Sequence, residues 1–214
     1  MQNLSIIIFT FKIAAFNVLI GLPIAISFAL LVRKYPGWLT KILETASMLP
    51  LVLPPVVTGF LLLGLLGKNG LIQSYTPFKF DIIFTWKAAV IASTVISFPL
   101  IYKPIKIALF SYDRRLELVA RSLGSTRWKV YRTIIFPLCR KGIITGSLLG
   151  FARSIGEFGA TVILLGNIYG KRTLSIEIYN LIEIGKENEA YILIFVSVLI
   201  SLIVISATEV YERI

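Results

Sequence analysis

Arg153 and Glu157 are two ionisable residues that stand four positions apart inside an apolar run covering roughly residues 142–166. Charged groups near the centre of a membrane-spanning segment are costly, and they usually face a bundle interior or water. At this spacing the two side chains can also neutralise each other on one helix face. The pair therefore indicates either a structural ion pair or the border of a polar translocation pathway.

Residue types that other chemistry would need are scarce. The chain has no His and a single cysteine, Cys139, which excludes a zinc site, an intrachain disulfide and a Cys–His nucleophile. Residues 166–172 superficially resemble a phosphate-binding loop, but they have one spacer too few, and Arg172 stands where Ser or Thr must contact magnesium. We therefore predict no catalytic residue, no metal and no cofactor bound by this chain.

The composition is that of a membrane protein. Of 214 residues, 57% are hydrophobic and 15% are charged, whereas soluble domains are about half apolar and a quarter charged. A membrane helix needs about 20 apolar residues. We predict an all-α polytopic protein with one domain, residues 1–214. Its five spans are expected at about 8–32, 46–66, 85–104, 142–166 and 190–209.

The distribution of basic residues predicts the orientation. The loops after the first and third spans, together with the C-terminus, hold 14 Lys and Arg, against 6 on the opposite side. Cytoplasmic loops carry such an excess. We therefore expect the N-terminus outside and the C-terminus in the cytoplasm. The net charge of +11 then reflects orientation in the membrane rather than binding to nucleic acid.

Prolines and glycines interrupt two of the spans. Pro50, Pro54 and Pro55 remove backbone hydrogen bonds in the second span. This span is either a kinked packing helix or a broken element that lines a pathway. In the fourth span, small residues at every fourth position predict close packing of another helix, which belongs to the same chain or to a second copy; these are Gly142, Gly146 and Gly150.

Residues 105–141 are predicted to form a cytoplasmic helix–turn–helix. Asp113 can cap the first helix, and Gly124 can end it in the left-handed conformation. Ser125 or Thr126 can cap the second helix, which we expect to stop at Pro137.

The two short helices carry an apolar stripe that must be covered. In the first helix, Leu116, Val119, Ala120 and Leu123 recur at helical spacing, and in the second Trp128 and Tyr131 share a face. Basic residues border both. The stripe fits either a groove on a partner protein or the membrane surface.

At these positions the chain resembles the "EAA" coupling loop of ABC importer membrane subunits. Glu117, Ala120, Gly124 and Pro137 carry the likeness, with Glu117 one place early. Residues 49–57 and 151–161 both look like the molybdate permease subunits of that family, and the resemblance extends from about residue 5 to 210.

The resemblance implies a set of partners and roles. Two copies of the chain would form the pathway, two cytoplasmic subunits would bind ATP and magnesium, and an extracytoplasmic protein would deliver the oxyanion. The residues implied to couple to the ATPase are Leu116, Glu117, Val119, Ala120, Leu123, Gly124, Trp128, Tyr131 and Pro137. Those that could border the pathway are Pro50, Pro54, Pro55, Arg153 and Glu157.

The outer loop, residues 165–189, is expected to contain a short helix that ends near Gly185. It either lies along the membrane interface or forms a docking or gate element. The favoured function is a plasma-membrane (inner-membrane) permease that imports molybdate or tungstate by alternating access. A sulfate or thiosulfate permease is the alternative within the class. A channel or secondary carrier without an ATPase is the alternative outside it, although the chain shows no internal inverted repeat.

Overall fold

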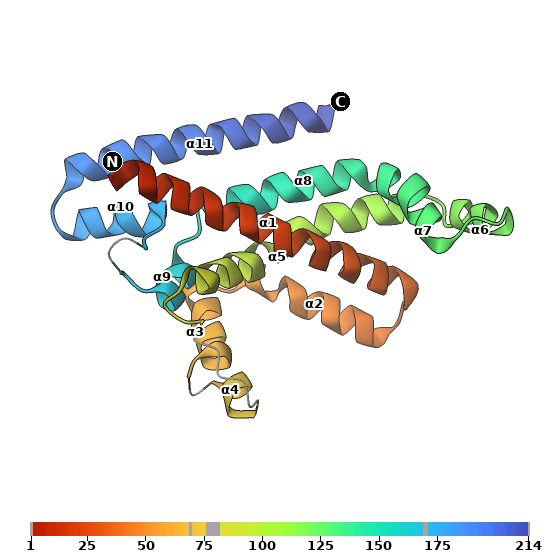
Figure 1. Ribbon diagram of the computed structural model, residues 1–214, viewed down its shortest axis with the longest axis horizontal. Coiled ribbons are helices and arrows are strands. Elements are labelled where there is room, and N and C mark those ends of the chain that lie inside the picture. Colours follow the sequence, from red (N-terminus) through yellow and green to blue (C-terminus); the bar gives the residue numbers. More distant parts are fainter. Residues whose placement is uncertain (1, 69, 76–81, 169–170, 214) are drawn as a thin grey trace.

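The computed structural model describes residues 2–68, 70–75, 82–168 and 171–213, which contain helices and connections and no strand (Figure 1). The helices are α1 (Gln2–Lys34), α2 (Trp38–Val52), α3 (Pro55–Leu66), α4 (Leu71–Tyr75), α5 (Trp86–Ser111), α6 (Arg115–Ser122), α7 (Arg127–Val130), the π-helix η1 (Tyr131–Ile135), α8 (Phe136–Ile155), α9 (Gly159–Leu165), α10 (Leu174–Glu183) and α11 (Glu187–Arg213).

Five helical runs within the described residues are long and apolar enough to cross a membrane, which confirms the all-α polytopic fold. They are Asn3–Lys34, Pro55–Tyr75, Trp86–Ser111, Arg127–Ile155 and Glu187–Val210. The third run, α5, is the centre of the bundle, with 67% of its most apolar window buried. The corresponding share in the other four lies between 17% and 28%.

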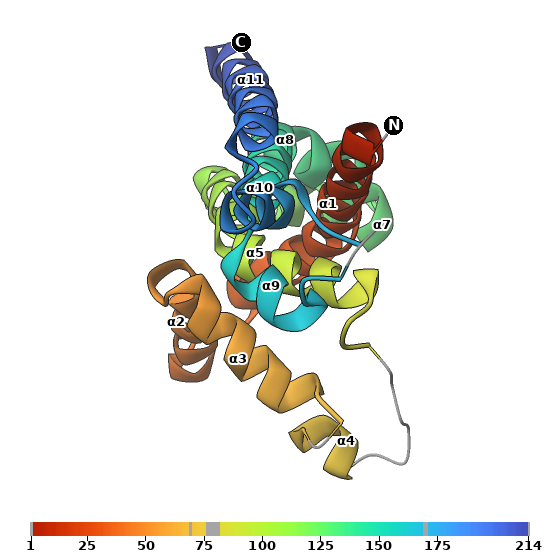
Figure 2. The same ribbon diagram turned by 90° about the vertical axis from the view of Figure 1, so that its left-hand side faces the viewer.

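Helix α5 is buried because α1, α8, α9 and α2 all pack against it. The arm formed by α3 and α4 reaches away from the bundle of α1, α5 and α8, and α11 lies along α8 and α10 (Figure 2). The outlying helices expose large apolar side chains, such as Phe60 on α3 and Phe195 on α11. Such surfaces require lipid or another membrane helix to cover them.

The expected second span, 46–66, is two helices rather than one. Leu53 and Pro54 are both extended, with ψ of 142° and 134°, and α3 begins at Pro55. The cause is local, because a residue that precedes proline disfavours the helical conformation, and here two in a row do so. The prediction that the second span is a broken element rather than a kinked helix is therefore confirmed for the backbone. Pro50 lies inside α2.

The expected fourth span, 142–166, is also not continuous. Helix α8 ends at Ile155, the chain turns through Gly156 and Phe158, and the short helix α9 starts at Gly159. Two glycines within four residues weaken the helix here, since each costs about 1 kcal/mol relative to alanine in a helix interior.

The segment between the third and fourth spans is shorter than the predicted 105–141. Helix α5 continues through Pro104 to Ser111, because a lysine near a span end need not terminate the helix. Pro137 does not stop the second helix either. It lies in the first turn of α8, directly after η1, whose wider π turn relaxes the backbone where proline cannot donate a hydrogen bond.

Candidate functional site

The turn between α6 and α7 is built as the sequence predicts. Gly124 has a φ of +83°, its N–H donates to the carbonyl of Arg121 at 3.0 Å, and the N–H of Ser125 donates to that of Ala120 at 3.0 Å. This pattern is a Schellman C-cap. Thr126 caps α7, since its Oγ1 accepts from the N–H of Lys129 at 3.3 Å. The two short helices are therefore locally well defined.

The apolar stripe divides into an exposed and a packed part. Leu116, Val119, Leu123 and Trp128 are 47%, 58%, 81% and 74% exposed. Ala120 instead packs against the core cluster formed by α1, α5 and the start of α8. The residues that remain exposed form a surface that nothing in the described chain covers, which favours an external partner.

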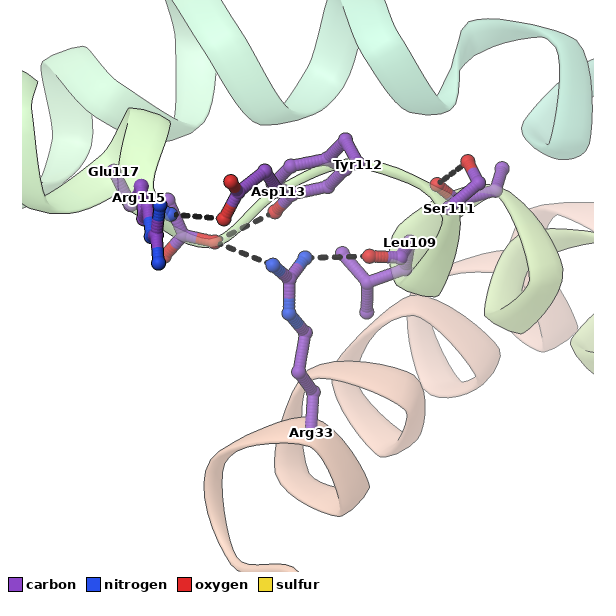
Figure 3. Close-up of polar contacts among 8 residues, drawn as sticks. Arg33, Leu109, Ser111, Tyr112, Asp113, Arg115 and Glu117 are labelled. Atoms are coloured by element: carbon purple, nitrogen blue, oxygen red, sulfur yellow. Dashed lines mark hydrogen bonds and ion pairs between the residues drawn. The ribbon is translucent and has the colours of Figure 1, made fainter.

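Glu117 faces inward and forms part of a junction with α1 (Figure 3). Its Oε1 lies 3.1 Å from Nη2 of Arg33, and it accepts a hydrogen bond from the Tyr112 hydroxyl at 2.7 Å. Arg33 also donates to the carbonyl of Leu109 at 2.5 Å and stacks over the Tyr112 ring. In the structure Glu117 therefore connects α6 with α1 and the end of α5, and its implied coupling to an ATPase stays a prediction.

Tyr112 is suited to this junction. Burial, and next the hydrogen bond to Glu117, raise the pKa of its phenol above the ordinary value of 10.0. The hydroxyl therefore stays protonated and remains a donor to the carboxylate throughout the physiological range. Asp113, in the connection to α6, accepts from the N–H of Arg115 at 2.8 Å, so it satisfies one free amide of the α6 N-terminus as expected.

Arg153 and Glu157 form the ion pair that their spacing predicts. Nη2 of Arg153 lies 2.7 Å from Oε2 of Glu157, and the two side chains are 29% and 1% exposed. Oε1 of Glu157 also accepts from the N–H of Ala160 at 3.0 Å, which caps the start of α9. The carboxylate thus has a structural role at the break between α8 and α9. Its place relative to a pathway stays a prediction.

The two helix breaks pack against each other. A Cβ added to Gly159 would lie 2.9 Å from Cβ of Pro55, and one added to Gly59 would lie 2.8 Å from Cα of Ala160. Only glycine permits this approach of α3 to α9. The structure therefore brings together the Pro54–Pro55 and Glu157 regions, although Glu157 follows Pro55 by 102 residues in the sequence.

The glycine seam of α8 is a contact within the chain. A Cβ at Gly142 would lie 2.4 Å from the carbonyl oxygen of Pro104, and one at Gly146 would lie 2.6 Å from that of Ile101. A Cβ at Gly150 would clash with the Ile101 side chain. The predicted packing role is confirmed, and α5 of the same chain is the partner.

The centre of the bundle contains a buried polar network that the sequence pattern did not predict. Asn17 donates to the carbonyl of Gly150 at 2.9 Å, and its Oδ1 accepts from the hydroxyl of Ser97 at 2.8 Å. The available signal was a lone Asn in the apolar first span, which must find partners. The pairs Glu44–Lys106 and Arg172–Glu177 were also missed.

The outer loop contains the expected helix. Helix α10 is followed by Gly185 with a φ of +74°, and Lys186 donates to the carbonyl of Leu181 at 2.8 Å. Parts of the resemblance to a phosphate-binding loop, at residues 169–170, lie outside the described residues. Among the described residues, no group of three His, Cys, Asp or Glu could hold a metal ion.

A membrane helix bundle with a short amphipathic helix pair at one end matches a known architecture. Residues 21–213 match the family described as "Binding-protein-dependent transport system inner membrane component". The chain belongs to this family. It is therefore a multi-pass inner-membrane transport component, as the resemblance at residues 105–141 indicated.

Relatives within the family are similar over nearly the whole chain. The molybdenum transport system permease protein ModB of Escherichia coli strain K12 is 43% identical, with 97% of this chain and 93% of that protein covered. ModB of Haemophilus influenzae is 38% identical with the same coverage. These identities confirm the resemblance to molybdate permeases.

Solved structures show the same fold. The MetNI methionine ABC transporter has a TM-score of 0.63 at 17% identity, covering 98% of this chain and 94% of that chain. An amino acid ABC transporter has a TM-score of 0.63 at 20% identity, covering 99% and 93%. The predicted orientation of the termini is not tested by these likenesses and stays a prediction.

Proposed function

We propose that this chain is the membrane permease subunit of an ATP-driven molybdenum importer, which moves molybdate or tungstate by alternating access. The observation that carries the proposal is the combination of 43% identity to a molybdenum permease over nearly the full chain with the exposed coupling helices. The alternatives are not favoured, because the relatives above carry molybdenum in their names and an ATPase-independent carrier would leave α6 and α7 without a partner.

The ATPase would bind at α6 and α7. Their exposed apolar side chains fit a groove on a soluble partner, and the exposed basic residues Arg115 and Lys129 beside them suit a groove with an acidic border. The chain itself would bind neither ATP nor magnesium. Movement of the ATPases would reach the bundle through Arg33, which ties α6 to both α1 and α5.

The pathway would lie between two copies of the chain. The broken backbone at Pro54–Pro55 packs on the break at Glu157, and non-helical backbone within a membrane occurs where it is buried in protein or lines a water-filled cavity. An extracytoplasmic binding protein would dock on the opposite end, where α10 lies (Figure 1), and would supply the selectivity for the oxyanion.

The docking surface can be tested with a matched pair of variants. Leu123→Asp places a charge on an 81% exposed stripe residue, whereas Ser122→Asp places the same charge on its exposed neighbour. We expect Leu123→Asp to abolish copurification of the ATPase and Ser122→Asp to retain it. Retention in both variants would argue against docking at this stripe. Light scattering of the wild-type complex should give two permeases and two ATPases.

The cargo is tested by uptake. The chain is reconstituted in liposomes with its ATPase and binding protein, and ATP-dependent uptake of molybdate, tungstate and sulfate is measured side by side. We expect molybdate or tungstate uptake that sulfate does not match and that stops without the ATPase. Equal sulfate uptake would contradict the assignment of molybdate or tungstate as the cargo. Uptake without an ATPase would contradict the assignment of the chain to an ATP-driven importer.

A further inference from the structure

Two cavities adjoin at the end of the bundle that carries α6 and α7. The smaller has a volume of about 170 Å³ and the larger about 590 Å³. Leu30 of α1 and Tyr131 and Ile135 of η1 line both. The two cavities are therefore neighbouring parts of one groove between α1 and the start of the fourth span. Two of these three shared residues belong to a π-helix, a feature that often marks functional sites.

The smaller cavity is strongly basic. Of the residues that line it, one is acidic, Glu117, and its carboxylate is already held by Arg33 and Tyr112. The basic residues in its wall are Arg33, Lys34, Arg114, Arg121 and Arg127. Apart from Arg33, none of them has a carboxylate of the described residues within ion-pair distance. This wall is suited to an anionic group.

The larger cavity is apolar. It is lined by Cys139 and by aliphatic and aromatic side chains from α1, α5, α7, η1 and α8, and Arg132 is the one basic residue in this lining. It includes Ile26, which lies eight residues before the end of α1 at Lys34, or about 12 Å along the helix at 1.5 Å per residue. The groove thus runs from the basic cavity along the membrane-spanning part of the bundle.

The position of the groove matches the two parts of a lipid. Helices α1 and α5 end at Lys34 and Ser111, and the fourth span begins at Arg127, so three spans end around the basic cavity. Basic pockets between membrane helices bind lipid headgroups. We propose that this groove is a binding site for an anionic phospholipid, with its phosphate in the basic cavity and an acyl chain along Ile26, Ile105 and Ile143.

Other occupants explain only part of the groove. A free oxyanion or nucleotide phosphate would account for the arginines but leave the apolar part empty. A soluble ATPase could reach Trp128 and Tyr131, but it would have to enter the membrane to reach Ile143, which lies 16 residues beyond Arg127 in the same helical run. A phospholipid satisfies both parts at once, and it would brace α1 against α7 at the point where α6 is attached.

The test is lipid retention by the full chain. The protein is purified in detergent and titrated with dioleoyl phosphatidylglycerol or with dioleoyl phosphatidylcholine, and bound lipid is counted by native mass spectrometry. We expect one phosphatidylglycerol to bind with clear preference over phosphatidylcholine. Since one basic residue contributes about fivefold at an anionic surface, the triple variant Arg114→Gln/Arg121→Gln/Arg127→Gln should lower that preference by at least about tenfold.

Matched variants separate the site from general charge and from folding. Lys129→Gln/Arg140→Gln/Lys141→Gln removes the same charge from exposed positions at the same end that do not line the basic cavity, and it should retain the preference. Leu30→Trp, which fills the junction of the two cavities, should reduce retention of both lipids. Thermal unfolding in detergent checks that each variant is folded.

Three outcomes would overturn the proposal. Equal loss of the preference for phosphatidylglycerol in both triple variants would show that general surface charge causes that preference. Displacement of the lipid by millimolar glycerol phosphate, inorganic phosphate or molybdate would assign the site to a free anion. Displacement by the ATPase would make the groove part of the docking surface. None of these readouts depends on the identity of the cargo.

Discussion

Arg33 and Glu117 form an ion pair of 3.1 Å that joins the last turn of α1 to the first turn of α6 (Figure 3). Both side chains are largely buried, at 12% and 24% exposed. Arg33 also donates to the carbonyl of Leu109 near the end of α5. One side chain, Arg33, therefore connects α6 to two membrane helices.

This junction predicts a loss of coupling rather than of folding. Glu117→Gln keeps an oxygen that accepts from Tyr112 but removes the charge that holds Arg33. The loss of this ion pair weakens the contact between α6 and α1 by about 1–3 kcal/mol. We expect the assembled transporter to hydrolyse ATP while the molybdate imported per ATP falls. Glu183→Gln is the control, since Glu183 accepts from Tyr179 in an exposed pair on α10. Unchanged stoichiometry in Glu117→Gln would contradict the junction's role.

Substitutions at Gly124 should alter ATP-driven uptake through backbone conformation alone. A Cβ at this position would meet nothing within 4 Å, but the φ of +83° costs about 1–2 kcal/mol for most residues. We expect Gly124→Ala to reduce ATP-driven uptake and Gly124→Asn to retain most of it, because Asn tolerates the left-handed conformation. Similar uptake in the two variants would show that the left-handed backbone conformation at residue 124 does not limit transport. Gly185→Ala makes the same change in the turn after α10, where φ is +74°, and should leave ATPase binding intact, whereas Gly124→Ala should weaken it.

Gly146 predicts a steric effect. Its Cβ would lie 2.6 Å from the Ile101 carbonyl oxygen, so Gly146→Ala must separate α5 from α8. We expect a destabilisation of about 1–3 kcal/mol, measured as a lower midpoint of thermal unfolding in detergent. Gly64→Ala is the matched control, because a Cβ there has open space in α3. A midpoint as high as that of Gly64→Ala would contradict the close contact.

Substitutions at Glu157 should lower stability in graded steps. Glu157→Gln removes the ion pair but keeps an acceptor for the N–H of Ala160, whereas Glu157→Ala removes both and should be about 1 kcal/mol less stable. The double variant Arg153→Met/Glu157→Gln leaves no unpaired charge and should recover stability. If its uptake also recovers, the pair is structural. A stable protein without uptake would place the pair on the pathway.

Much of this protein follows from its sequence. Apolar runs of membrane-crossing length determine the number of spans, because an uncovered polar backbone cannot enter lipid except as a helix. The α6–α7 turn is equally local, since Gly124 and Thr126 supply the C-cap and the N-cap themselves. The spacing of Arg153 and Glu157 likewise predicts their ion pair.

Only the tertiary structure decided what these elements contact. Glu117 stands one position early in the coupling-loop pattern, and the sequence does not show that Arg33, 84 positions earlier, is its partner. The glycine seam could have served a second copy, and it is filled by α5. The breaks at Pro54 and Glu157 each look like isolated interruptions, yet they pack together. Sequence periodicity determines which face of a helix is buried, but the choice of partner depends on shape and charge brought together by the whole bundle.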